Sequence, residues 1–233
     1  MIDVQSTLGD LVTANPALAN ELVRRGLDPC CGGGRRFADA CAAAGLDAEA
    51  VAAELATVDE PASPPAWATM GLVQLVDHVE ATHHRYLDAE LPRLDDLAVT
   101  VLRVHGERHP ELAGVRRLVA ELRLDLVPHL AKEERVLFPA VRALAVADGA
   151  DPWLQAPIGV MRLEHDHAGN LLDDLRAITG GYAAPDDACA SYRALYAGLA
   201  ALDDDTRLHV HKENNVLFPA VLRTEQRLVE RSA

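Results

Sequence analysis

Two stretches of this chain nearly repeat each other: HLAKEERVLFPAV at residues 129–141 and HVHKENNVLFPAV at residues 209–221. Each contains a histidine and a glutamate four positions apart, which places both side chains on one face of a helix, one turn apart. Apolar residues recur at helical spacing around them, so both pairs fall on a buried stripe. A carboxylate in an apolar core is costly unless something compensates it. The repeat therefore predicts a bound metal with His129, Glu133, His209 and Glu213 as ligands. The plainer alternative is a buried salt bridge that was duplicated, but it leaves His84 and His165 without a role.

The same offset identifies two more histidines. His84 and His165 lie 81 residues apart, and the distances from His84 to His129 and from His165 to His209 are 45 and 44 residues. His165 also falls on an apolar stripe. The apolar stripe before His84 points at its neighbour His83 at least as well, so periodicity alone does not decide between them; the repeat favours His84.

Three other histidines are expected outside this centre. His105 follows His84 by 21 residues, which is ~31 Å along one continuous helix, and its equivalent in the repeat is Pro185. We expect it to be an outer or helix-terminal residue. His167 and His211 each lie two residues after a predicted ligand, about 200° around the helix, and are expected to face outward.

Residues 69–233 consist of long apolar-periodic segments. They cover about 69–91, where Pro92 ends or kinks the helix before it continues to 105; 111–147, interrupted near Pro128 and Pro139; 156–179; and 186–227. Only 4% of the residues are aromatic, and the composition is rich in helix formers. We predict an all-α protein whose main part is an up-and-down four-helix bundle.

The first 58 residues are predicted to form a small helical N-terminal domain. Thr7 or Ser6 caps its first helix and Asp47 its last. Between these helices lies the sequence Asp28-Pro-Cys-Cys-Gly-Gly-Gly34, which its glycines keep out of a helix. A proline-rich segment at 59–68 is the predicted linker to the bundle at 69–233.

The charge of the chain excludes several classes of partner. There are 22 basic and 36 acidic residues, a net charge of −14, and such a surface repels nucleic acid and anionic lipid. No apolar run is long enough to span a membrane, and the N-terminus has no secretion signal. An adjacent cysteine pair is not the spaced framework of a secreted disulfide protein. We expect a cytoplasmic protein, monomeric or homodimeric.

The predicted ligand set favours two iron ions. Six ligands exceed the four that a zinc ion takes. Imidazole with carboxylate suits iron, and two symmetry-related glutamates can bridge a metal pair. Ferritin-type bundles use Glu-x-x-His and more carboxylates, whereas both copies of the repeated pair here are His-x-x-x-Glu. Six protein ligands with an oxo or hydroxo bridge leave open positions on two octahedral irons.

Over nearly its whole length the chain resembles the iron–sulfur cluster repair di-iron proteins, which join a hemerythrin-like bundle to a short cysteine-bearing domain. Pro29 departs from the family, where an aromatic residue is common. The matching motifs are Asp28 with Cys30-Cys31-Gly32-Gly33, Ala40-Cys41, His84-Arg-Tyr-Leu with Glu90-Leu-Pro, His105-Gly106, Glu164-His165-Asp166, and the two His-x-x-x-Glu segments including Glu213-Asn214-Asn215.

The resemblance implies repair of iron–sulfur clusters damaged by nitric oxide or oxidants, by supply of iron to the damaged proteins. It indicates an iron donor rather than a turnover enzyme, with Cys30 and Cys31 as transfer thiols. The following helix start and Arg35-Arg36 favour their thiolates, whereas Cys41 and Cys189 are expected to be small buried apolar residues. Two alternatives stay open: a nitric oxide or peroxide reductase, and a sensor or carrier of oxygen or nitric oxide.

Overall fold

The computed structural model describes residues 2–59, 61, 63, 65–148 and 153–232. Regular structure in these residues is helical, apart from one isolated antiparallel bridge between Thr7 and Arg36. None of the described helices is both long and apolar enough to cross a membrane. The predicted all-α fold class is confirmed.

The chain forms two compact units. The first comprises Met1–Val79, Ala140–Ile158 and Arg207–Ala233, and the second comprises Glu80–Pro139 and Gly159–Thr206. The predicted division at residues 58 and 68 stays a prediction, and residues 60, 62 and 64 of the predicted linker lie outside the described residues.

The N-terminal part of the first unit is a set of short helices. Its helices are α1 (Leu8–Ala14), α2 (Leu18–Arg24), α3 (Phe37–Ala43) and α4 (Ala48–Leu55). The Thr7 hydroxyl accepts a hydrogen bond from the Asp10 N–H, and the Asp47 carboxylate accepts one from the Ala50 N–H. These bonds satisfy N–H groups that the first turn of a helix leaves free, so the predicted caps Thr7 and Asp47 are confirmed.

These short helices share a small apolar core. Val12, Leu22 and Phe37 are fully buried in it. Cys41 is also fully buried, and burial, with a smaller effect of Asp47, raises the pKa of its thiol. The prediction that Cys41 is a buried apolar residue is confirmed.

The rest of the first unit is also helical. It contains η1 (Ala66–Thr69), α5 (Leu72–Val79), most of α8 (Phe138–Leu144), the π-helix η4 (Lys212–Leu217) and α11 (Phe218–Ser232). The ends of α9 and α10 also belong to it.

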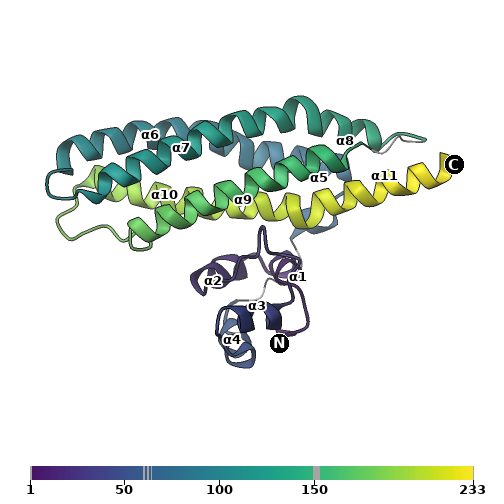
Figure 1. The fold of residues 1–233 in the computed structure, drawn as a ribbon, viewed down its shortest axis with the longest axis horizontal. Coiled ribbons are helices and arrows are strands. Elements are labelled where there is room, and N and C mark those ends of the chain that lie inside the picture. The colour runs from purple at the N-terminus through teal and green to yellow at the C-terminus, as the bar shows by residue number, and fades with distance from the viewer. Residues whose placement is uncertain (1, 60, 62, 64, 149–152, 233) are drawn as a thin grey trace. The chain divides into compact units, whose positions relative to one another are not determined.

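The second unit is a four-helix bundle. It contains the π-helix η2 (Glu80–His84), α6 (Arg85–His105), α7 (Glu111–Lys132), the π-helix η3 (Glu133–Leu137), and most of α9 (Gln155–Ile178) and α10 (Ala190–His211). In this unit α6, α7, α9 and α10 run side by side (Figure 1). Each contributes fully buried side chains to one core, such as Leu87, Leu122, Leu172 and Leu199. The predicted bundle is confirmed.

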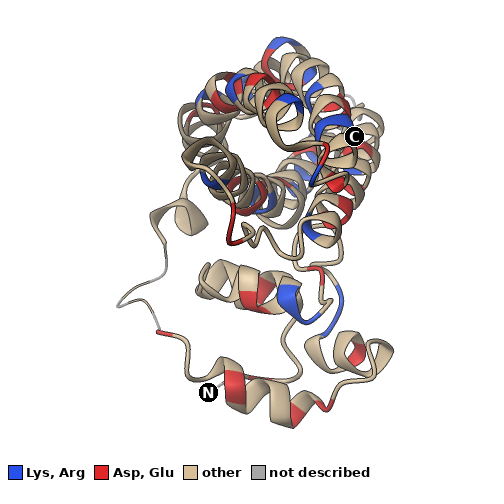
Figure 2. Cartoon of the chain, turned by 90° about the vertical axis from the view of Figure 1, so that its left-hand side faces the viewer, with Lys and Arg blue, Asp and Glu red and all other residues tan. Residues whose placement is uncertain are grey.

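Acidic and basic residues are intermixed along the bundle helices (Figure 2). Opposite charges form pairs between neighbouring helices, as between Arg123 and Asp95 at 2.7 Å and between Arg176 and Asp203 at 2.8 Å. The excess of acid in the sequence is therefore spread along the helices together with basic side chains.

Two prolines lie inside helices that they do not end. The prediction that Pro92 ends or kinks the helix is wrong as to an end, because α6 continues through this residue from Arg85 to His105. The predicted interruption near Pro128 is also wrong, because α7 runs through that residue. An interior proline costs about 3 kcal/mol, and burial of the neighbouring leucines in the core opposes that cost.

Candidate metal centre

Four of the predicted ligands lie buried in the second unit. They come from three stretches of helix, because η3 follows α7 directly. His84 is the last residue of η2, His129 lies in α7, Glu133 begins η3 and His165 lies in α9. Each is at most 2% exposed. The ionisable side chains are thus withdrawn from water, where an uncompensated carboxylate is costly.

A π-helical turn occurs at both copies of the His-x-x-x-Glu motif. The Phe138 N–H donates to the Glu133 carbonyl, and the Phe218 N–H donates to the Glu213 carbonyl, five residues back in each case. A proline follows each phenylalanine; its ring would clash with the carbonyl four residues back and it has no N–H to donate. The wider turn relieves this clash, and single π-turns occur frequently at functional sites.

The side chains of the second unit converge on Glu133. The Nε2 atoms of His84 and His129 each lie 3.5 Å from Glu133 Oε2, and His165 Nε2 lies 3.1 Å from His129 Nε2. Neither carboxylate oxygen of Glu133 has a hydrogen-bond partner within the described parts of the chain. Neighbouring ligand atoms on a metal bound at about 2.1 Å lie roughly 3.0–3.4 Å apart, so these separations fit a shared ion.

Two further carboxylates hold the histidines from outside. His84 Nδ1 lies 3.1 Å from Glu134 Oε1, and His129 Nδ1 lies 2.8 Å from Glu164 Oε2. Metal-bound histidines generally donate their other ring N–H in this way, which fixes the ring and directs the free nitrogen at the metal. Burial raises the pKa of the Glu164 carboxyl, but its bonds to Lys132 and His129 outweigh this and hold the pKa below its usual value.

Sequence reasoning did not assign these outer carboxylates. Glu134 and Glu164 are direct chain neighbours of Glu133 and His165, so the signal was adjacency to a predicted ligand. Neither lies on the buried stripe that the periodicity follows; both are about one-third exposed at the side chain.

The second copy of the motif lies in the first unit. His209 is in α10 and Glu213 in η4, and His209 Nε2 is 3.3 Å from Glu213 Oε1. Both residues are almost fully buried, as are their counterparts His129 and Glu133.

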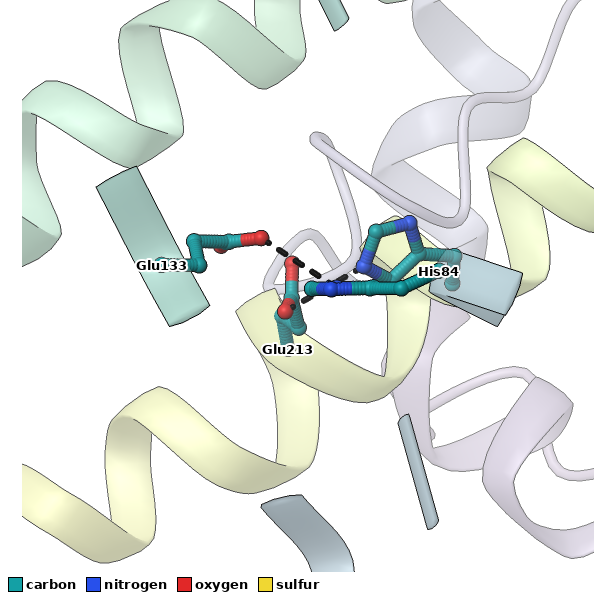
Figure 3. Close-up of side chains that lie close together, drawn as sticks. His84, Glu133 and Glu213 are labelled. Atoms are coloured by element: carbon teal, nitrogen blue, oxygen red, sulfur yellow. Dashed lines mark ion pairs between the residues drawn. The ribbon is translucent and has the colours of Figure 1, made fainter. Parts of the chain in front are cut away.

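Two groups of potential metal ligands contain all six predicted residues. The ligand atoms of His84, Glu133, His209 and Glu213 lie within 4.8 Å of one another, and so do those of His129, Glu133, His165 and Glu213. The side chains of His84, Glu133 and Glu213 point toward one another (Figure 3). Each group has two imidazoles of its own, and both groups share the two glutamates.

Two family models match this chain. The hemerythrin HHE cation binding domain matches residues 75–221, and a domain of unknown function, DUF542, matches residues 4–59. The iron–sulfur cluster repair protein YtfE of Citrobacter koseri is 35% identical over 218 residues, which are 94% of this chain and 97% of that protein. The protein of the same name from Escherichia coli O17:K52:H18 is 34% identical over the same share of both chains. The chain belongs to the iron–sulfur cluster repair proteins of the hemerythrin HHE family.

All six predicted ligands fall inside the hemerythrin HHE match. The resemblance stated from the motifs is confirmed, and the buried histidines and glutamates form a metal centre in a cation-binding domain. The individual ligand roles stay a prediction.

In this hemerythrin HHE chain the competing histidines have other contacts. His83 is also buried, but its Nδ1 lies 2.8 Å from Asp205 Oδ1, and it is in neither group of four. His105 is the last residue of α6, and its Nε2 lies 3.1 Å from the sulfur of Cys189.

Two expectations about exposure are wrong. His211 is buried rather than outward-facing: its Nε2 lies 3.1 Å from the Thr13 hydroxyl and its ring packs edge-on against Trp67. Burial lowers the pKa of His211 to about 4. Cys189, which lies just before the first residue of α10, is exposed rather than buried.

The cysteine pair lies in a turn organised by Asp28. The Asp28 carboxylate accepts hydrogen bonds from the N–H groups of Cys30, Cys31 and Gly32, and from the Cys30 thiol at 2.9 Å. An acid rather than an arginine thus contacts this thiol, while Arg36 donates to Gln5. The expected contact between the Cys30 thiol and a nearby arginine is therefore not found.

The turn nevertheless has the composition of a small metal site. The two sulfur atoms are 3.9 Å apart, and thiolates on one tetrahedral metal at about 2.3 Å would be about 3.8 Å apart. Asp28, Cys30 and Cys31 offer three ligand atoms within 4.8 Å of one another.

Glu164→Gln should lower the affinity of the centre for metal, although all six predicted ligands remain in place. Loss of the carboxylate that orients His129 is expected to weaken metal binding about 10- to 100-fold, measured by competition with a chelator. Asp166→Asn is the matched control, because it removes the same charge from an exposed position two residues away. Equal losses in both variants would show a general charge effect and contradict the orienting role.

Proposed function

We propose that this chain repairs damaged iron–sulfur clusters, and that its centre is a pair of iron ions which share Glu133 and Glu213. The observation that carries the proposal is the sharing of both glutamates by two groups of four buried ligands. His84 and His209 would complete one iron site, and His129 and His165 the other. The curated relatives are named as iron–sulfur cluster repair proteins.

The donor set supports iron better than a structural zinc ion. A zinc site takes four tetrahedral ligands and is then closed, whereas six ligands shared between two ions leave positions open. When bound, the iron pair supplies redox-active, exchangeable metal with room for small ligands. The protein holds the imidazoles in place through Glu134 and Glu164.

The thiols of Cys30 and Cys31 are proposed to take part in iron transfer. No disulfide joins the four cysteines, all of which the structure describes, and this suits a reducing compartment such as the cytoplasm. The Asp28 turn brings three ligand atoms together. The proposed domains are 1–58, with the cysteine pair, and 69–233, with the iron pair, joined by 59–68.

The test is iron transfer to a damaged partner. The iron-loaded full-length chain is incubated with a dehydratase whose iron–sulfur cluster has been damaged by nitric oxide, and the dehydratase activity and the iron content of both proteins are followed. We expect reactivation with a matching loss of iron from this chain. Reactivation without that loss would contradict iron supply and favour a reductase, and a reversible spectral change without reactivation would favour a sensor.

A further inference from the structure

The cysteine loop is bound by the helical turn that carries Glu213, and both belong to the first unit. The Asn215 side-chain amide donates to the backbone carbonyls of Cys30 at 3.0 Å and Pro29 at 3.3 Å. Asn214 also donates to the Cys30 carbonyl, at 3.4 Å. Asn215 thus binds the loop through its backbone, only two residues after a predicted metal ligand.

Two glycines make room for Asn215. A Cβ atom at Gly33 would lie 2.2 Å from Asn215 Oδ1, and one at Gly9 would lie 2.9 Å from it. Gly33 does not have a positive φ, so its backbone conformation does not require glycine; the close approach does. The Gly9 N–H donates to the Gly33 carbonyl at 2.8 Å, and this bond holds together the two glycines that lie against Asn215.

His211 closes the same contact from one turn before Asn215. Its Nδ1 lies 3.3 Å from the Pro29 carbonyl oxygen and 3.3 Å from Asn215 Nδ2. His211 and Asn215 are four residues apart, as are His209 and Glu213, so the two pairs lie on different faces of one continuous helical stretch. One face carries predicted ligands, and the other binds the cysteine loop.

We infer that Asn215 is a positioning residue that latches the Cys30-Cys31 loop to the Glu213 turn. The latch fixes the place of the thiols through the carbonyl of Cys30 itself, and it keeps the Cys30 side chain, which is 3% exposed, away from solvent. The inference rests on the proposed function only in giving that position a use in iron transfer; the latch itself is a property of the fold.

The first test measures access to the Cys30 thiol in the iron-loaded full-length chain. Asn215→Asp keeps the shape of the side chain but replaces the donor with an oxygen facing two carbonyl oxygens, and Asn215→Ala removes the side chain without adding charge. Both should increase the rate of Cys30 alkylation by iodoacetamide roughly tenfold, as expected for the loss of two hydrogen bonds. Alkylation is located by mass spectrometry of peptide fragments.

Three comparisons make this result specific. Asn170→Asp, at an exposed position of α9, should leave the rate unchanged. Alkylation of Cys41, which is fully buried in the N-terminal core, should not increase, and iron content should stay at the wild-type value. An unchanged Cys30 rate, or an equal increase at Cys41 that reports unfolding, would overturn the latch.

A double-mutant cycle with Gly9 separates the latch from general stability. Gly9→Ala favours α1 by its helix propensity, yet it should speed Cys30 alkylation because the new methyl group displaces Asn215. In the Asn215→Ala background the same substitution should have a smaller effect, because only the contact of its methyl group with the Gly33 carbonyl oxygen, at 3.1 Å, remains. Equal effects of Gly9→Ala in both backgrounds would overturn the inference. Faster alkylation with undiminished cluster repair would leave the latch standing and contradict the proposed use of the thiols.

Discussion

Glu133→Leu is expected to remove most of the iron from the purified protein, because Glu133 lies in both groups of ligands and both ions would lose a shared carboxylate. Loss of an outer carboxylate costs about 10- to 100-fold in metal affinity, and loss of a direct, shared ligand should cost more than 100-fold. The measurement is iron per chain, together with the near-ultraviolet charge-transfer absorption of an oxo-bridged ferric pair. Glu213→Leu should behave in the same way.

The stability of the metal-free protein should change in the opposite direction. Without an ion, Glu133 is a fully buried carboxyl whose oxygens have no hydrogen-bond partner within the described parts of the chain. A buried polar group without a hydrogen bond costs about 1–3 kcal/mol, and an apolar side chain of similar size removes that cost. Metal-free Glu133→Leu should therefore unfold at the same or a higher urea concentration than metal-free wild type.

The control is Glu230→Leu, the same substitution at an exposed position of α11. It should change neither the iron content nor the stability of the metal-free form by more than about 0.5 kcal/mol. Wild-type iron content in both Glu133→Leu and Glu213→Leu, or one zinc ion per chain, would contradict the proposed centre.

The internal repeat made most of the metal centre predictable. A His-x-x-x-Glu pair is a local pattern, since helix geometry alone places both side chains on one face. The same pattern at 129 and 209 indicated duplicated chemistry, and the offset pointed to His84 and His165, which lie in the two groups of potential ligands. Periodicity could not separate His84 from His83, because both are buried; their different contacts do.

The surroundings of the centre could not be predicted from local patterns. Helical periodicity correctly placed His211 on a different face from His209, but that face is outward only if nothing covers it. Thr13 and Pro29, almost 200 residues earlier in the chain, contact it. Contacts between segments so distant in sequence leave no trace in the period of either one, and the position of Asn215 was missed for the same reason.

Proline ended fewer helices than expected, and the reason is related. Pro92 and Pro128 lie inside helices whose buried leucines belong to the bundle core, and tertiary packing routinely overrides local propensity. Before Pro139 the chain instead adopts a π-turn, η3, which begins at the predicted ligand Glu133.

Replacing Cys30 and Cys31 together with serine should leave the iron pair intact and reduce cluster repair. The Asp28 turn is held mainly by backbone N–H groups of residues 30–32, so serine keeps its shape. A serine hydroxyl is not the metal ligand that a thiolate is, and we expect the initial rate of dehydratase reactivation to fall about tenfold or more. Iron per chain and the charge-transfer spectrum should equal those of wild type.

Cys189→Ser is the matched control for this variant. Cys189 is an exposed thiol outside both groups of iron ligands, so its loss tests whether any accessible thiol supports the assay. We expect wild-type repair from Cys189→Ser. Full repair by the Cys30→Ser, Cys31→Ser variant would assign the cysteine pair a structural role, because the Asp28 turn and its binding to Asn215 depend on backbone atoms that serine leaves in place, and the bundle alone would then carry the repair function.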